Sequence, residues 1–315
     1  MIARAWANVE AWVDEREPVT WMALFRIAIG LVVLNILASI TLSGVLPVVW
    51  YPIEDGGLGR LAGDWRVAWL GGPSPRVTHA LMTGALLGGL SLVLGVGSRV
   101  GALVAGQCMI ALFSLQPRTG GGHDMLLANA LWLLVLAPAD RSLSLTAWWR
   151  TGRLVDPTRY AAWPRALVCY QITVVYALTG LQKASPEWWP WGGLDAVYRS
   201  LLQQSYAKAD WSWIVSHYFG VTQLMTIGTV LWEAGFPMLL VWAWARRRGH
   251  AFGRWPMRTV FLGTGIVVHG LLWLTLDLGP FPFVTLAFYF AWFDEHDWAR
   301  VGGLLRPGRA GYAPS

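Results

Sequence analysis

The stretch WMALFRIAIGLVVLNILASITLS, residues 21 to 43, decides the fold class, because it holds one charged residue, Arg26, in 23 mostly apolar positions. A helix of roughly 20 apolar residues crosses the hydrocarbon core of a bilayer. The rest of the chain is similar, since 55% of its 315 residues are hydrophobic, only 13% are charged and the mean hydropathy is +0.45. We therefore expect an all-α, polytopic transmembrane helical bundle without a large soluble domain.

Eight apolar segments can be drawn along the chain, and the third, fourth and eighth are short enough to be tilted or to span incompletely. Their predicted bounds are 21–43, 78–96, 100–115, 124–138, 165–184, 221–244, 259–277 and 280–293. Residues 1–20 are predicted to form an amphipathic interfacial segment, residues 21–293 one membrane domain and residues 294–315 a cytoplasmic tail. No internal repeat is visible, which disfavours a transporter built from inverted halves.

The basic residues predict an orientation, because arginine and lysine are enriched on the cytoplasmic side of membrane proteins. With eight spans and both termini in the cytoplasm, 16 arginines fall inside and 7 basic residues fall outside. The predicted location is therefore the cell inner or plasma membrane, with membrane lipid as a partner. The net charge of +6 lies in short patches without the interleaved aromatic residues of single-strand binders, so no nucleic acid is expected.

Lys183 is the first candidate for a functional group. The chain holds 22 arginines but only two lysines, Lys183 and Lys208. Helical spacing places Tyr176 and Thr179 on the same stripe as Lys183, which indicates a face turned to the bundle interior. A lysine withdrawn from water loses its proton more readily and can act as a base, whereas a lysine at a span end also serves as an interfacial anchor. Both interpretations remain open on the residues alone.

His123 follows three glycines in the segment RTGGGHDMLLANALW, where the backbone can be approached closely. Asp124 is a candidate N-cap of the next helix. From spacing alone, we favour an interfacial helix start for this histidine over a catalytic role.

Two further ionisable groups lie inside predicted spans, where such groups are expensive. Glu233 shares a polar stripe with threonines, and Pro237 follows it and is expected to bend the helix. A carboxylate in the membrane needs a partner or a proton, and we expect Arg26 or His269 to supply it. A structural Arg26–Glu233 pair that fixes helix register is as good an explanation as a functional one.

The remaining sequence patterns give little information about function. The segment DEHDW, residues 294 to 298, contains three carboxylates and a histidine but follows the last span, so a solvated helix end is expected and no metal site is predicted. No HExxH, CxxC, GxSxG or phosphate-loop pattern occurs, so the hydrolase, zinc and nucleotide-dependent classes lack positive support.

Five segments together resemble a known family, the HTTM membrane domain that is shared with the vitamin K-dependent γ-carboxylases. They are LFRIAIGLVVL (24–34), GGGHDMLLANALWLLVLAPADRSLSLTAWW (120–149), YALTGLQKASPEWW (176–189), WEAGFPMLL (232–240) and VVHGLLW (267–273). The resemblance covers about residues 20 to 293.

The resemblance implies functions for particular residues. Lys183 matches the lysine with which the carboxylases deprotonate reduced vitamin K, and His123 matches a histidine that assists carboxylation. A reduced naphthoquinone of the vitamin K type is therefore an implied co-substrate, at a site that faces the extracytoplasmic side. The carboxylases bind their peptide substrate through a large lumenal region after the membrane domain, whereas this chain continues for 22 residues after the last predicted span. We therefore do not expect peptide carboxylation.

Two hypotheses of different classes follow. In the first, the chain is a membrane lyase or quinol epoxidase in which Lys183 is the base, His123 assists, and Glu233 and His269 orient the helices. A separate periplasmic protein as partner would favour this first hypothesis. In the second, the chain is a non-catalytic maturation or immunity factor for a secreted peptide, similar to the sporulation-delaying protein B group.

Overall fold

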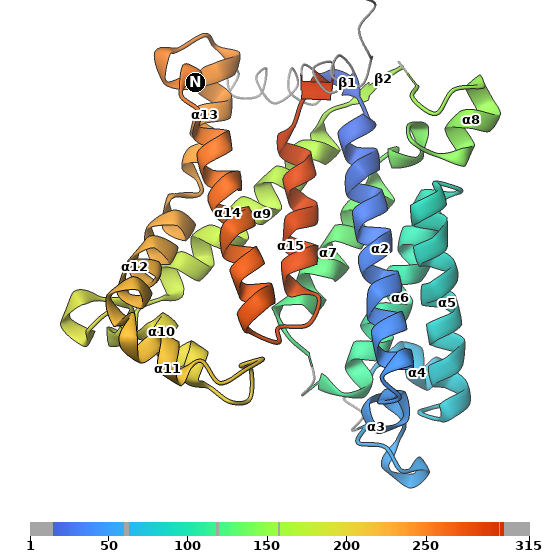
Figure 1. Cartoon of the computed structure of the whole chain (residues 1–315). Coiled ribbons are helices and arrows are strands. Elements are labelled where there is room, and N and C mark those ends of the chain that lie inside the picture. Colours follow the sequence, from blue (N-terminus) through green and yellow to red (C-terminus); the bar gives the residue numbers. More distant parts are fainter. Residues whose placement is uncertain (1–14, 60–62, 118–119, 157, 296, 299–315) are drawn as a thin grey trace, which may run out of the picture.

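The computed structural model describes residues 15–59, 63–117, 120–156, 158–295 and 297–298. The predicted all-α class is confirmed, because the described chain is built of helices apart from one two-stranded ribbon (Figure 1). The helices of the predicted spans are α2 (Thr20–Leu42), α5 (Pro75–Leu94), α6 (Ser98–Leu115), α7 (Gly122–Leu136), α9 (Trp163–Gln182), α12 (Phe219–Gly235), α13 (Met238–Arg247), α14 (Met257–Thr275) and α15 (Phe281–Ala287), which continues into η7 (Phe288–Trp292).

Four of these helices, α2, α5, α6 and α14, are long and apolar enough to cross a membrane. The helices α12 and α13 add a fifth candidate span if they are taken as one, since they meet at a bend of 47°. Pro237 is the N-cap of α13, and the kink predicted at this proline is therefore confirmed. The helix α7 and the segment Phe281–Trp292 are apolar but shorter, and α9 carries polar side chains such as Arg165 and Gln171.

The helices form two groups that α9 and α15 connect. On one side α2 packs against α5, and α5 packs against α6, which packs against α7. A Cβ atom on Gly88 of α5 would lie 2.6 Å from the carbonyl oxygen of Gly101 in α6, so glycine permits this close helix contact. On the other side α12 packs against α9, which also contacts α7, while α15 contacts α2, α7 and α14.

Short elements gather at the two ends of the bundle (Figure 1). The strand end, at the top of Figure 1, contains β1 (Arg16–Pro18) paired antiparallel with β2 (Arg159–Ala161), in the register Arg16 opposite Ala161. It also contains η3 (Ala139–Arg141), α8 (Leu145–Thr151) and η6 (Ala251–Arg254). The loop end, at the bottom, contains α3 (Leu46–Trp50), η1 (Ile53–Asp55), α4 (Trp65–Trp69), η4 (Pro186–Trp188), η5 (Pro190–Gly192), α10 (Ala196–Leu202) and α11 (Ser212–His217).

The predicted interfacial segment and tail are only partly described. Residues 1–14 of the segment and residues 299–315 of the tail lie outside the described residues. Within the tail, Asp297 accepts two bonds of 2.6 Å from Arg258, and Glu295 lies 2.7 Å from Arg159. Burial raises the pKa of the Asp297 carboxyl, but the bonds from Arg258 and from the backbone of Asp294 outweigh burial and hold this pKa below its usual value. The described carboxylates of this segment therefore bind arginines.

Candidate functional site

Lys183 lies at the C-terminal end of α9, where its side chain is 15% exposed. Its ammonium nitrogen Nζ forms an ion pair with Glu233 of α12 and donates a bond of 3.3 Å to the Thr179 carbonyl. It also lies 4.9 Å from the ring centre of Trp188, within the range of a cation–π contact. The indole nitrogen of Trp189 donates to the Lys183 carbonyl at 2.8 Å, which fixes the chain just past the helix. Lys183 is thus held inside the protein by four contacts.

Glu233 is the partner of Lys183, and its side chain is 13% exposed. Close packing of the two helices makes this pairing possible, because a Cβ on Gly180 would lie only 2.6 Å from the backbone nitrogen of Ala234. The expectation that Arg26 or His269 partners Glu233 is wrong. The helix that reaches the carboxylate is α9, which packs against α12, and neither α2 nor α14 supplies the partner.

Arg26 lies in a different part of the bundle, completely buried. Its Nη2 donates a bond of 2.7 Å to the carbonyl of Leu143, in the segment between η3 and α8 at the strand end. This contact ties α2 to the segment that follows α7. Arg26 therefore has a packing partner of its own, and the structural Arg26–Glu233 pair is excluded.

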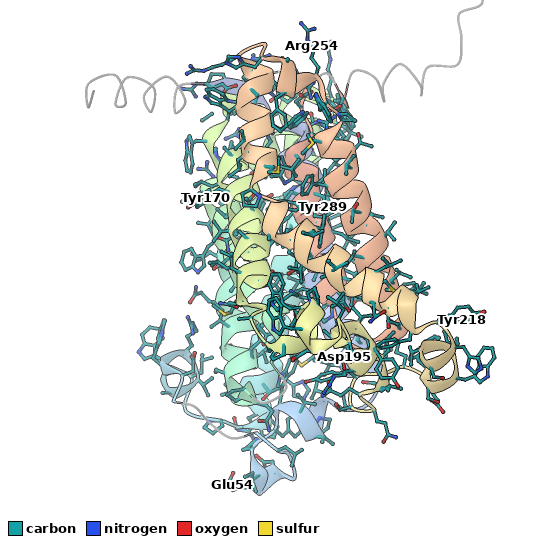
Figure 2. The ribbon with its side chains drawn as sticks, turned by 90° about the vertical axis from the view of Figure 1, so that its left-hand side faces the viewer. Glu54, Tyr170, Asp195, Tyr218, Arg254 and Tyr289 are labelled. Carbon is teal, nitrogen blue, oxygen red and sulfur yellow. The ribbon has the colours of Figure 1, made fainter. Side chains whose placement is uncertain are left out.

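A buried polar cluster joins α9, α14 and η7. The Tyr176 hydroxyl lies 2.7 Å from Nε2 of His269 and 2.8 Å from the hydroxyl of Tyr289. The Nδ1 atom of His269 has no hydrogen-bond partner among the described residues. Gly265 makes room for this cluster, because a Cβ there would collide with Tyr289. Figure 2 places Tyr289 inside the bundle, on the strand-end side of its middle.

The polar stripe predicted on α9 is confirmed as an inward face. Tyr176 is 3% exposed, and Thr179 is half-buried, with its hydroxyl donating 3.0 Å to the Tyr176 carbonyl. Tyr289 was missed by sequence reasoning. It stands in an aromatic run, and no motif there distinguishes a tyrosine that bonds from one that only packs.

His123 lies at the start of α7, at the loop end. Its Nε2 is 2.9 Å from Oδ1 of Asp124. The helix begins at Gly122, so Asp124 is the third residue of its first turn and is not the N-cap that was expected. The other Asp124 oxygen accepts a bond of 3.1 Å from the backbone nitrogen of Gly121. The Asp124 carboxylate therefore accepts a hydrogen bond from the backbone at the start of α7 and also contacts the His123 imidazole.

A cavity of about 960 Å³ opens beside His123. Its walls are mostly apolar, with a few polar side chains that reach into it, which is the usual composition of a small-molecule site. The residues that line it include His123, Asp124, Lys208, Trp273, Asp277 and Phe281.

The structure separates the two residues that the resemblance paired. Lys183 is not among the residues that line the cavity of His123. The polar cluster connects the two places: Phe281 lines the cavity and its ring centre lies 5.6 Å from that of His269, which bonds to Tyr176. Tyr176 in turn packs against Trp232, the neighbour of Glu233, at 4.6 Å between ring centres.

Metal binding has no support in the described part of the chain. Groups of three or more histidine, cysteine or carboxylate side chains that could hold an ion are absent there. Lys183 instead pairs with Glu233, and His269 bonds to Tyr176.

The fold and these contacts define a class, a helical membrane protein with ionisable side chains held inside its bundle. The sequence profile of the HTTM domain matches residues 15–298, nearly the whole chain, and the protein therefore belongs to the HTTM family. The resemblance to the membrane domain of the vitamin K-dependent γ-carboxylases agrees with this membership. No curated protein and no solved structure matches the chain.

Proposed function

We propose that this HTTM protein is a membrane enzyme that deprotonates a reduced quinone or another lipid-soluble substrate with an acidic hydroxyl, with Lys183 as the proton acceptor. The observation that supports this proposal best is the Lys183–Glu233 ion pair inside the bundle. A lysine that served only as an interfacial anchor would extend toward water, whereas this one is 15% exposed and turned to a carboxylate.

The pair explains how a lysine could accept a proton. Lys183 and Glu233 together hold one proton when the pair is neutral, either as ammonium and carboxylate or as amine and carboxylic acid. A proton acceptor needs a free nitrogen lone pair, which Lys183 has in the second form. The substrate O–H bond then breaks, an N–H bond forms on Lys183, and the electron pair stays on the substrate oxygen. The new ammonium stabilises that oxygen anion.

The cavity beside His123 is proposed to receive a co-reactant, because Lys183 does not line it and the substrate hydroxyl must reach Lys183. Its volume of about 960 Å³ lies at the upper end of the range for small-molecule sites. His123, oriented by Asp124, assists the reaction, and the His269 cluster holds α9, α14 and η7 in register between the two places.

The topology belongs to the same proposal. Eight spans, with α12 and α13 counted as one and with both termini cytoplasmic, fit the arginine distribution in the cell inner or plasma membrane. The loop end would then face the extracytoplasmic side. A cysteine introduced at Ser212 in α11 should react with a membrane-impermeant maleimide in intact cells; labelling only after permeabilisation would reverse the orientation.

The enzyme proposal is tested by incubating membranes that contain the protein with a reduced naphthoquinone, oxygen and bicarbonate. Oxygen is the oxidant for the step after deprotonation. We expect an oxidised quinone product, its loss in Lys183→Ala, and its retention in the control variant Arg76→Ala, which removes an exposed cation outside the cavity of His123. Absence of product, or equal product from Lys183→Ala, would remove the proposal.

A second candidate function is maturation of, or immunity to, a secreted peptide. The loop end supports it, because large aromatic side chains there are open to a partner: Trp69 is 87% exposed and Trp191 is 75% exposed. In this case Lys183→Arg should retain full activity in a peptide-production assay, and a small secreted precursor should be encoded beside this gene.

A further inference from the structure

A separate cavity of about 390 Å³ opens at the strand end, where η3 and the starts of α6 and α9 meet the β-ribbon. It shares no residue with the cavity of His123 and does not involve Lys183. The charged and aromatic residues that line it are Arg16, Arg99, Asp140, Arg141, Tyr160 and Trp163. We call it the arginine cavity.

The arginine cavity has an excess of positive charge. Its three arginines come from different elements, Arg16 from β1, Arg99 from the first turn of α6 and Arg141 from η3. Among the described residues that line it, Asp140 is the only carboxylate. It lies 3.8 Å from Arg141 and also interacts with the charge of the buried Arg26.

Two of the three guanidinium groups lack an acidic partner in the described part of the chain. Within the described ranges, the arginine–carboxylate pairs do not include Arg16 or Arg99. Arg99 makes only long bonds of 3.3 and 3.4 Å, to the carbonyls of Ala137 and Leu136. A neighbouring cavity of about 560 Å³ shares Arg16 with the arginine cavity. Its other arginines differ from Arg99, because each of them pairs with a carboxylate, as in the 2.5 Å pair of Arg165 with Glu17.

The remaining walls suit an amphipathic anion. The helix α6 follows Gly97 without a side-chain cap, so its first backbone N–H groups and the positive end of its dipole add to the charge of Arg99. Tyr160 and Trp163 supply rings of the kind that lie at the level of lipid headgroups. Val100 gives the cavity an apolar edge beside them.

We propose that the arginine cavity binds the phosphate group of an anionic phospholipid. Guanidinium groups bind phosphate through paired, charge-assisted hydrogen bonds, and basic pockets between transmembrane helices bind anionic headgroups. The glycerol would contact Tyr160 and Trp163, and the acyl chains would leave along Val100. A bound headgroup would link β1, η3 and α6. The proposal does not depend on the activity of Lys183.

The test measures retention of phosphatidylglycerol by the full-length protein, by native mass spectrometry after reconstitution with phosphatidylcholine and phosphatidylglycerol. We expect Arg99→Gln and Arg141→Gln each to weaken binding about fivefold, and the double variant about 30-fold. The matched control is Arg76→Gln, which removes an exposed arginine at the start of α5, at the loop end. Equal retention by all variants would overturn the proposal.

Two further measurements keep the result interpretable. A photoactivatable phosphatidylglycerol added to the wild-type protein should crosslink to peptides that contain Val100 or Trp163, and crosslinks confined to other faces would contradict the site even if a variant failed to fold. Inorganic phosphate and glycerol phosphate serve as competitors. Failure of both to displace the lipid supports a membrane source, whereas displacement at micromolar concentration would overturn the lipid and assign the site to a soluble phosphate compound.

Discussion

The ion pair of Lys183 and Glu233 should appear as an energetic coupling between two positions 50 residues apart. Removal of one partner from a buried ion pair leaves an uncompensated charge, at a cost of about 3–5 kcal/mol. Here the side chains are 15% and 13% exposed, so some solvent remains to screen the lone charge. We expect Lys183→Met and Glu233→Gln each to lower the free energy of unfolding by about 2 kcal/mol.

The double variant should be far less destabilised than the two single losses together. Removal of both charges leaves no unpaired ion, and such replacements are often nearly neutral. We expect a loss of about 1 kcal/mol, partly from the missing contact of the ammonium with the Trp188 ring. The coupling energy of the cycle is then about 3 kcal/mol.

The assay is reversible unfolding in mixed micelles of dodecyl maltoside and sodium dodecyl sulfate, monitored by circular dichroism. The matched control pairs Lys208→Met with Glu233→Gln, since Lys208 is exposed and donates to the Trp273 carbonyl. These two changes should add within about 0.5 kcal/mol. A coupling below about 0.5 kcal/mol for the Lys183–Glu233 cycle would refute the pair.

Three other changes have defined outcomes. Gly180→Ala forces a Cβ against the α12 backbone and should lower the free energy of unfolding by about 2 kcal/mol, which a fall in the melting temperature would report. The control Gly228→Ala should be neutral, because its Cβ meets nothing within 4 Å. Tyr176→Phe removes two buried hydrogen bonds and should lower the free energy of unfolding by about 1–3 kcal/mol without changing the helix content. The pKa of Asp297 is lowered in the folded protein, so its bond to Arg258 stabilises the fold above the ordinary carboxyl pKa, and this stabilisation is lost as the pH falls below it. Asp297→Asn should therefore reduce the loss of unfolding free energy at acidic pH. An acidic pH dependence equal to that of the wild type would contradict the contribution of this bond.

The helices could be predicted from the sequence, because an apolar run long enough to cross a membrane is compatible with few structures other than a helix. The first predicted segment, 21–43, corresponds to α2 at Thr20–Leu42, a shift of one residue at each end. The bend between α12 and α13 was also predictable, since Pro237 cannot continue the hydrogen-bond pattern of a helix. Both features, the bounds of α2 and the bend at Pro237, depend on residues that are close together in the sequence.

The partner of Glu233 could not be predicted, because it depends on which helices touch. Periodicity placed Glu233 and Lys183 each on a polar stripe of its helix, yet it gave no information about the helix opposite. Gly180 was the available signal, since a small residue one turn before Lys183 marks a close helix contact. The N-cap of α7 was misplaced by three positions, at Asp124 instead of Gly121, for a related reason: Gly121 and Gly122 give no side-chain signal for where α7 begins.

The separation of His123 from Lys183 has a similar cause. The resemblance paired these residues by function, and sequence alone carries no distance between the start of α7 and the end of α9. The cavity beside His123 is formed by segments far apart in the chain, among them Trp50, Lys208 and Phe281. Such a cavity becomes visible only when the helices are assembled.

The measurement that tests the central claim most directly is the turnover of reduced naphthoquinone by Lys183→Arg. Arginine keeps the positive charge and can still pair with Glu233, but it does not release its proton at physiological pH. A fold and stability close to wild type combined with a turnover reduced at least 100-fold, with the control Arg76→Lys fully active, is the predicted result. Wild-type turnover by Lys183→Arg would contradict the claim that Lys183 accepts a proton.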